Sequence, residues 1–292
     1  MTALLLACDD ERHLAEPLAA ALGVPLRWIE RHAFPDGETR LRLPPELPPR
    51  VALLRGLQQP NGKLAELMIL APAARELGAQ QLTLVCPYLA YMRQDMAFRP
   101  GEAVSQRHVG QALAGWFDAV VTVDPHLHRV ATMDEVLPGR VGVALSAAPL
   151  LGAWAARHAQ RPILLGPDAE AAPWVRSAAL AQGLEHGTCV KQRSGDREVR
   201  VALPPMNFQG REVVLIDDVA STGRTLAVTA AALRARDAVA VDVAVTHALF
   251  VGDAIDQLQR AGVRHVWSSD SVAHASNVVS VVPLLAAALR AS

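Results

Sequence analysis

Short apolar runs alternate along this chain with longer alanine-rich stretches in which apolar residues recur at helical spacing. The apolar runs are rich in Val, Leu and Ile and include ALLLA, VALLRG, LTLVCP, AVVTVD, PILLGP, EVVLIDD, VDVAVTHALF and HVWSS. Between them, the spacing predicts helices over 63–78, 105–117, 169–183, 225–236 and 253–261. Regular alternation of strands with helices is typical of parallel sheets, so the pattern predicts an α/β fold.

The stretch LPGRVGVALSAAPLLG, residues 137–152, divides the chain near its middle. Each half holds its own series of strands and helices, so a duplication is the simplest arrangement. We therefore expect two doubly wound domains with parallel sheets, covering residues 1–145 and 146–292. Ligands of such sheets bind at the carboxyl ends of the strands, where several of the apolar runs finish in polar or turn residues.

Composition narrows the classes of function. The 292 residues carry 28 basic and 29 acidic side chains, a formal net charge of -1, so no global positive field predicts nucleic acid binding. No apolar stretch approaches the roughly 20 residues of a membrane helix, and the one near the C-terminus is interrupted by Pro283. Cys8, Cys86 and Cys189 are odd in number and far apart, which favours neither a disulfide framework nor a zinc site. We expect a cytoplasmic protein with no membrane partner.

The segment VVLIDDVASTGRTL, residues 213–226, carries the most specific chemistry. A buried strand over 213–216 is expected to place Asp217 and Asp218 at its tip, and the small residues 220–225 then lead into a helix. Backbone N–H groups that converge beside a helix N-terminus form an anion cradle. Carboxylates would repel that anion unless sugar hydroxyls or a divalent metal intervened, and a ribose phosphate supplies both a diol and an anion. The segment matches neither the Walker A nor the GxGxxG pattern. The alternative is a strand that ends in an Asp-Ser-Thr cluster capping the next helix, which is common in α/β proteins.

Other motifs admit two interpretations each. In FPDGE, residues 34–38, turn chemistry can present the Phe34 ring for stacking on a base, or it can fold that ring into the core. Arg93 of YMRQD can hold a phosphate with two hydrogen bonds, or it can be solvated. His126 and His128 suggest a zinc hydrolase as a rival, but no further ligands at recognisable spacing accompany them.

Taken together, these motifs resemble one family. Two acids followed by Thr-Gly-x-Thr closely resemble the loop that binds phosphoribosyl pyrophosphate in phosphoribosyltransferases and ribose-phosphate pyrophosphokinases. The series RHAFPDGETRLRL, PNGKLAEL, CPYLAYMRQDMAFRPGEAVS, TVDPHLH and GPDAEAAPW occurs in the order and near the spacings of the pyrophosphokinases, from about residue 30 to the C-terminus. The serine at position 221 is similar to the archaeal branch of that family. The resemblance implies two phosphoribosyltransferase-like domains, the first on the ATP side and the second on the ribose 5-phosphate side.

The resemblance also implies roles for individual residues. Ribose 5-phosphate would be bound by Asp217, Asp218, Ser221, Thr222, Gly223, Arg224 and Thr225, and ATP by Phe34, Asp36, Glu38, Arg93, Gln94, Asp95 and His126. Lys191 and Arg193 match the catalytic lysine and arginine, although alternating basic residues also occur on solvated hairpin edges. His126 and Asp168 would hold Mg²⁺, which bridges the ATP phosphates. In the family the loop around Phe34 reaches a neighbouring subunit, which implies a homo-oligomer with a shared ATP site.

The implied reaction transfers the pyrophosphoryl group of ATP to the anomeric hydroxyl of ribose 5-phosphate, giving phosphoribosyl pyrophosphate and AMP. One alternative is a phosphoribosyltransferase or related pentose-phosphate enzyme, which would keep residues 217–225 but use ATP poorly. Another is a catalytically silent regulatory homologue. The presence of Lys191, Arg193, His126 and Asp168 argues against a silent homologue.

Overall fold

The computed structural model describes residues 2–194 and 198–291, and the side chains of 191–200 lie outside what it describes. The chain divides into two compact units. Unit 1 comprises Met1–Leu145 together with Val281–Ser292, and unit 2 comprises Ser146–Ser280. The expected second domain, 146–292, thus extends beyond the compact unit 2, which ends at Ser280. The last helix, α9 (Val282–Ala291), buries an apolar face and packs on α1 (Arg12–Leu22) of unit 1.

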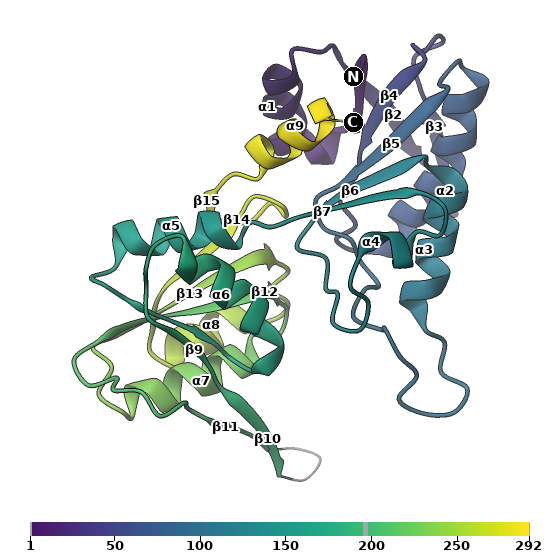
Figure 1. Cartoon of the computed structure of the whole chain (residues 1–292). Helices are drawn as coiled ribbons and strands as arrows, with labels where there is room; N and C mark the ends of the chain where they lie inside the picture. Colours follow the sequence, from purple (N-terminus) through teal and green to yellow (C-terminus); the bar gives the residue numbers. More distant parts are fainter. Residues whose placement is uncertain (1, 195–197, 292) are drawn as a thin grey trace. The chain divides into compact units, whose positions relative to one another are not determined.

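Unit 1 is built on a seven-stranded sheet with the order β3-β2-β1-β4-β5-β6-β7 (Figure 1). All neighbouring strands are parallel except β2 and β3, which form an antiparallel hairpin. The strands are β1 (Leu4–Cys8), β2 (Leu26–Ala33), β3 (Thr39–Arg42), β4 (Arg50–Leu54), β5 (Gln81–Cys86), β6 (Ala119–Val123) and β7 (Val141–Leu145). The other helices are η1 (Asp9–Glu11), α2 (Pro60–Glu76), α3 (Ser105–Trp116) and α4 (Met133–Val136).

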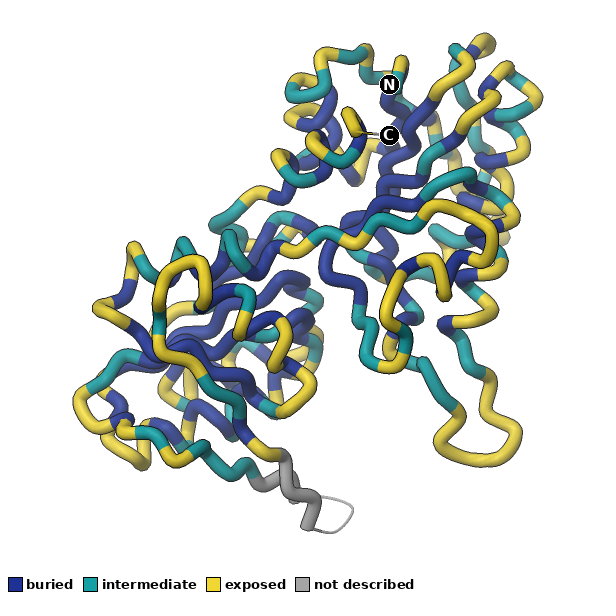
Figure 2. The backbone as a smooth tube through the Cα atoms, viewed as in Figure 1, coloured by how far each residue is buried: buried dark blue, intermediate teal, exposed yellow. Residues whose placement is uncertain are grey.

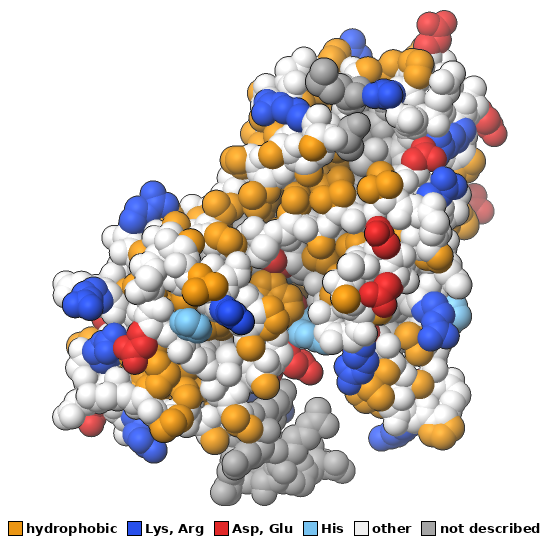
Figure 3. All heavy atoms as spheres, in the orientation of Figure 1, with side chains coloured by type: hydrophobic (Ala, Val, Ile, Leu, Met, Phe, Trp, Pro, Cys, Tyr) orange, Lys and Arg blue, Asp and Glu red, His pale blue; other side chains and the backbone are white. Residues whose placement is uncertain are grey.

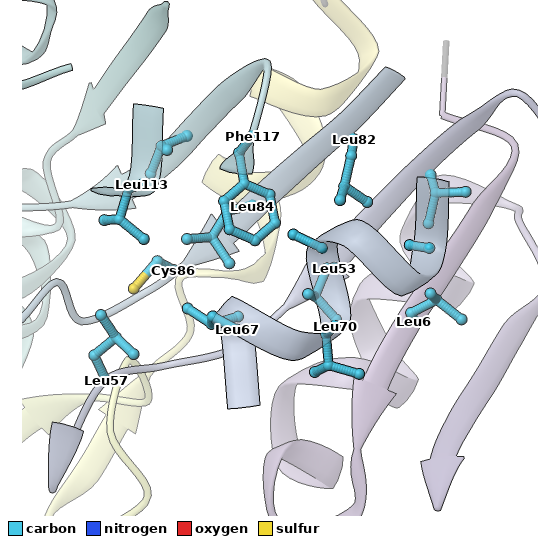
Figure 4. Close-up of a cluster of buried hydrophobic side chains, with 14 of the residues drawn as sticks. Leu6, Leu53, Leu57, Leu67, Leu70, Leu82, Leu84, Cys86, Leu113 and Phe117 are labelled. Atoms are coloured by element: carbon cyan, nitrogen blue, oxygen red, sulfur yellow. The ribbon is translucent and has the colours of Figure 1, made fainter. Parts of the chain in front are cut away.

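A large core of unit 1 lies between its strands and α2 and α3, and the strands are also contacted by α1 and α9. Every residue of β1 is buried, as expected for a parallel strand covered on both faces (Figure 2). Figure 4 shows Leu6, Leu53 and Leu84 from three neighbouring strands beside Leu67 and Leu70 of α2. The apolar runs of the sequence are therefore the interior of this unit.

Unit 2 is built on a six-stranded parallel sheet with the order β15-β14-β13-β12-β8-β9. The strands are β8 (Ile163–Gly166), β9 (His186–Thr188), β12 (Glu212–Ala220), β13 (Ala240–Ala248), β14 (Val263–Ser269) and β15 (Asn277–Val279). The helices are α5 (Ala148–His158), η2 (Ala169–Ala171), α6 (Ala172–Leu180), α7 (Arg224–Arg234) and α8 (Ala254–Arg260). β10 (Val190–Ser194) and β11 (Glu198–Ala202) form a separate antiparallel hairpin.

Helices cover both faces of the unit 2 sheet. On one face Val213, Leu215 and Val243 form a cluster with Leu226 of α7 and Leu258 of α8. On the other face, Val214, Ile216 and Ala244 form a cluster with residues of α5 and α6, including Leu151 and Val175. Odd and even positions of the strands thus serve opposite faces, and the doubly wound prediction is confirmed.

The two sheets share one topological feature. In unit 1 the chain passes from β1 to β2 and later returns to the other side of β1 as β4. In unit 2 it passes from β8 to β9 and returns to the other side of β8 as β12. Ligands of open parallel sheets bind where the strand order reverses in this way, at the carboxyl ends of the strands. The feature marks β1 and β4 in unit 1, and β8 and β12 in unit 2.

The described helices include none long and apolar enough to cross a membrane. On the face of the protein drawn in Figure 3, basic and acidic side chains are interspersed among uncharged ones.

Candidate active site

Three carboxylates lie at the carboxyl ends of β8 and β12. Leu165 of β8 pairs with Leu215 of β12, so Asp168 and Asp217 follow at the same edge of the sheet. Asp217 is partly exposed, whereas Asp218 is only 3% exposed. The Asp218 amide donates a 3.0 Å hydrogen bond to Oδ1 of Asp217. Asp168 accepts a 3.0 Å hydrogen bond from the Glu170 amide and caps η2.

The prediction that both acids stand at the tip of a strand is corrected by the structure. β12 continues through Asp217 and Asp218 to Ala220, because β13 is nine residues long and pairs with it that far. Val219 pairs with His247, and Ala220 pairs with Ala248. The extra strand pairing explains why Asp218 is buried and why Asp217 is the more accessible carboxylate.

The electrostatics of this site are unfavourable in the isolated chain. Part of Asp217 is accessible, but its carboxylate is closely surrounded by protein atoms, and this burial raises its pKa well above its usual value. The negative charges of Asp218 and Asp168 raise the pKa further. Each of these causes disfavours the ionised form of Asp217. A divalent cation or the hydroxyl groups of a sugar would offset the repulsion, because either places positive charge or hydrogen-bond donors beside the carboxylates.

The anion loop, residues 220–225, follows the acids and leads into α7. Gly223 has φ 68°, a left-handed conformation that glycine adopts without strain, and α7 begins at the next residue. The first N–H groups of an α-helix have no partner within the helix, so the start of α7 can receive an anion. Thr222 and Arg224 are exposed, while Ser221 and Thr225 are partly exposed. The predicted ribose 5-phosphate residues thus occupy one continuous turn beside Asp217.

The segment after β13 holds the anion loop in place. The amide of Leu249 donates to the carbonyl of Ala220 at 3.0 Å, and the amide of Val251 donates to the carbonyl of Ser221 at 3.1 Å. Beneath these bonds lies a buried polar network that the sequence interpretation missed: Thr246, His247, Ser269 and Ser271. The available signal was a histidine near the end of a strand that is buried along its whole length.

In unit 1 the motif FPDGE, residues 34–38, forms the tight loop between β2 and β3. The Phe34 amide donates to the carbonyl of Glu38 at 2.8 Å, and the Glu38 amide donates to Oδ1 of Asp36 at 3.1 Å. Phe34 is 39% exposed, and the centroids of its ring and the His32 ring, which are arranged edge to face, lie 4.8 Å apart. The ring is therefore not folded into the core.

The other predicted ATP residues of unit 1 differ in their availability. Arg93 is exposed, and Nε2 of Gln94 donates to the carbonyl of Met96 at 3.4 Å. Asp95 forms an ion pair with Arg129 at 3.2 Å, and its side chain is only 5% exposed. That carboxylate is already paired within unit 1, so a contact of Asp95 with ATP would require the ion pair to open.

The predicted metal residues belong to different units. His126 follows β6 in unit 1, and its ring lies perpendicular to that of His128 with centroids 3.9 Å apart. Asp168 follows β8 in unit 2. Of the predicted catalytic pair, the backbones of Lys191 and Arg193 lie in the extended strand β10. Their side chains lie outside the described part of the structure.

A second charged cluster, which the sequence interpretation also missed, lies where the strand order of unit 1 reverses. Arg55, directly after β4, is 1% exposed and donates to both carboxylate oxygens of Asp10 at 2.7 and 2.8 Å. It also pairs with Glu66 of α2. Arg31 of β2 joins the cluster through Asp10 at 3.1 Å and Glu66 at 3.4 Å. The strand that leads to Phe34 is thereby tied to β1, β4 and α2.

A doubly wound parallel sheet with paired acids and an anion loop where its strand order reverses defines a phosphoribosyltransferase-like protein. Sequence comparison agrees, because the family model of the phosphoribosyl transferase domain matches residues 150–284. A second model, the N-terminal domain of ribose phosphate pyrophosphokinase, matches residues 3–115. The two models together match most of the chain, and a relative 35% identical over 98% of it carries the same name, so the chain belongs to the ribose-phosphate pyrophosphokinase family.

Individual relatives span nearly the whole chain. The ribose-phosphate pyrophosphokinase of Methanopyrus kandleri is 35% identical over 98% of this chain and 98% of its own length. That of Halobacterium salinarum is 35% identical over 98% of this chain and 100% of its own length. The crystal structure of phosphoribosylpyrophosphate synthetase from Mycobacterium smegmatis has a TM-score of 0.85 at 26% identity, covering 100% of this chain and 98% of that one.

Proposed function

We propose that this chain transfers the pyrophosphoryl group of ATP to the anomeric hydroxyl of ribose 5-phosphate, forming phosphoribosyl pyrophosphate and AMP. One observation carries the proposal beyond family membership. Asp217 stands beside the anion loop with its pKa raised by burial and by two further carboxylates, an arrangement that a sugar diol or a divalent cation stabilises. A ribose phosphate brings the diol and the anion in one molecule.

In this proposal the sugar phosphate spans the anion loop and the acids. Its phosphate accepts hydrogen bonds from the amides and hydroxyls of Ser221, Thr222, Gly223 and Thr225, with Arg224 adding positive charge. Its ring hydroxyls donate mainly to Asp217, because Asp218 is only 3% exposed and contributes the smaller part of the contact. Because both ends of the sugar are held, the anomeric oxygen is presented in a fixed direction.

ATP is proposed to bind with its base against Phe34, Asp36 and Glu38 and its phosphates near Arg93, Gln94, Asp95 and His126. The exposed ring of Phe34 suits stacking on a purine. In a homo-oligomer, the loop around Phe34 would contribute to the ATP site of a neighbouring subunit. The proposed compartment is the cytoplasm, which agrees with three free, buried cysteines.

The residues that would hold Mg²⁺ are Asp168, which is partly exposed at the edge of the sheet, and His126. A carboxylate oxygen is the ligand type that Mg²⁺ prefers. The mutual repulsion of Asp168, Asp217 and Asp218 makes a bound cation favourable at this edge of the sheet. When bound, the ion would neutralise charge on the ATP phosphates.

During the reaction a bond forms between the anomeric oxygen and the β-phosphorus of ATP. The bond from that phosphorus to the oxygen bridging to the α-phosphate breaks, AMP leaves with that oxygen, and the hydroxyl proton passes to solvent. Lys191 and Arg193, from the β10–β11 hairpin, are proposed to offset the charge that spreads over the transferring phosphates. Catalysis then consists mainly of positioning and charge neutralisation.

The proposal is tested by incubating the purified protein with Mg²⁺, ATP and ribose 5-phosphate and measuring AMP together with the pyrophosphorylated sugar. We expect the two products in equal amounts. Absence of AMP would indicate a silent homologue, and AMP formed only with another sugar phosphate would reassign the acceptor. Formation of a nucleotide from phosphoribosyl pyrophosphate and a free base, with no use of ATP, would indicate a phosphoribosyltransferase.

A further inference from the structure

A network of four buried polar residues lies at the carboxyl ends of β13 and β14. Nδ1 of His247 and Oγ of Ser271 are 2.8 Å apart. The hydroxyls of Ser271 and Ser269 donate to the carbonyl of Thr246 at 2.9 and 2.7 Å. All four residues are at most 2% exposed. The Ser269 and Ser271 hydroxyls also lie 2.9 Å from each other, so the imidazole of His247 is part of one continuous hydrogen-bonded network.

This network fixes the end of β13, and the end of β13 in turn fixes the anion loop. His247 pairs with Val219 in the sheet, and two residues further on Leu249 donates to the carbonyl of Ala220. Val251 then donates to the carbonyl of Ser221. The loop is therefore bonded to the same short segment that the histidine anchors.

These two bonds determine where the amides of the loop point. The carbonyl of one residue and the N–H of the next belong to one planar peptide and point in opposite directions. A carbonyl of Ala220 that faces Leu249 turns the N–H of Ser221 the other way. A carbonyl of Ser221 that faces Val251 does the same for the N–H of Thr222. The amides that would receive the phosphate are thus aimed by the segment after His247.

We propose that His247 is a positioning residue for ribose 5-phosphate binding, acting through Ser271 and the end of β13 on the anion loop. The inference rests on the proposed role of that loop. A fully bonded buried network favours a single arrangement, whereas loss of one member leaves buried polar groups without partners and frees the segment to shift. His247 therefore acts on the affinity for the sugar phosphate and not on the chemistry at the anomeric oxygen.

The test compares His247→Leu, Ser271→Ala and His247→Asn with the wild type. Leucine and alanine each remove one side of the Nδ1–Oγ bond, and we expect the KM for ribose 5-phosphate to rise roughly tenfold, the change that corresponds to one buried hydrogen bond. The KM for ATP should change less than about twofold. The asparagine amide offers both a donor and an acceptor and can place one of them near the position of Nδ1, so this variant should recover most of the affinity.

Asp242→Asn is the matched control, because Asp242 lies near the opposite end of the same strand. Its carboxylate is fully buried and accepts two hydrogen bonds from Arg264, at 3.0 and 2.6 Å. This variant should lower the melting temperature at least as much as His247→Leu but leave the KM for ribose 5-phosphate unchanged. A selective effect at His247 therefore separates positioning from general loss of stability.

Calorimetric titration with ribose 5-phosphate, in the absence of ATP, completes the test. If the wild type binds the sugar phosphate and His247→Leu binds it equally well, the positioning role is refuted while the proposed function stands. A KM for ATP that rises in parallel, or an Asn variant as weak as the Leu variant, also contradicts the inference. If the wild type itself binds no ribose 5-phosphate, the proposed function fails first.

Discussion

Asp217→Asn is expected to stabilise the protein and to weaken its activity by at least tenfold. The substitution keeps an acceptor oxygen for the Asp218 amide, which bonds to Oδ1 of Asp217 at 3.0 Å. It removes a carboxyl group whose ionised form is opposed by burial and by the charges of Asp218 and Asp168. The carboxylate of Asp217 therefore lowers the stability of the wild type at a position where an amide would not. Such losses of stability are common at sites selected for activity.

The size of the stabilisation has an upper limit. Protonating a carboxyl group of ordinary pKa at pH 7 costs about 4 kcal/mol. If the repulsion of the ionised form cost more than that, Asp217 would take up a proton instead. The unfavourable free energy of Asp217 in the native state is therefore at most about 4 kcal/mol. We expect the free energy of unfolding to rise by about 1–4 kcal/mol at pH 7, and the melting temperature by several degrees.

The pH dependence gives the sign of the effect. A raised folded-state pKa means that the native protein binds more protons than the unfolded chain, so the wild type loses stability as pH rises from the unfolded pKa of Asp217 through its folded pKa. The amide does not titrate. The difference in melting temperature between Asp217→Asn and the wild type should therefore be small near pH 4, grow with pH, and level off above the folded pKa.

Scanning calorimetry across this pH range is the assay, with Asp256→Asn as the control. Asp256 is exposed on α8, and its substitution should change stability by less than about 0.5 kcal/mol at every pH. Destabilisation by Asp217→Asn, or a stabilisation that does not vary with pH, would refute the electrostatic reasoning. Activity should fall by at least tenfold through a higher KM for ribose 5-phosphate, since a neutral amide accepts weaker hydrogen bonds from the diol.

Three further outcomes are expected. Lys191→Ala should lower kcat by orders of magnitude with little change in ATP affinity measured by equilibrium binding, and equal losses of both would contradict a transition-state role. Arg55→Met should destabilise unit 1 by about 3–5 kcal/mol in urea unfolding, because Asp10 and Glu66 lose their buried partner; an unchanged midpoint would argue against the ion pairs. Gly223→Ala should cost about 1–2 kcal/mol of stability and raise the KM for ribose 5-phosphate, because φ 68° strains an alanine; a variant that matches the wild type in both would contradict the loop geometry.

Much of the fold could be predicted because central parallel strands of both units, such as β1, β4 and β8, are short continuous apolar runs. The parallel strands β2 and β9 carry polar residues and were not predicted. The observed ends of helices and strands differ from the expected ones where local chemistry or strand pairing determines them. α2 begins at Pro60, ahead of the expected residue 63, because proline suits the first turn of a helix. β12 extends beyond Asp217 because a long neighbouring strand pairs with it. The final helix, α9, belongs to unit 1 because its apolar face packs against α1, which is far away in the sequence.

The anion loop was recognisable for a similar reason. Its acids, small residues and helix start are contiguous, so spacing alone carries the pattern. The network of His247 and Ser271 was not recognisable, because its members lie on different segments and meet only once the register of β13 and β14 is set. The cluster around Arg55 likewise draws on β1, β2, β4 and α2, and the pairing of its charges depends on strand order.

The fate of the individual phosphates of ATP tests the central claim most directly. ATP carrying radioactive phosphorus at the α, β or γ position is incubated with ribose 5-phosphate and Mg²⁺, and the label is followed into sugar and nucleotide. The account predicts that β and γ labels move together onto the sugar while the α label remains in AMP. Transfer of the γ label alone, with ADP as the second product, would contradict it.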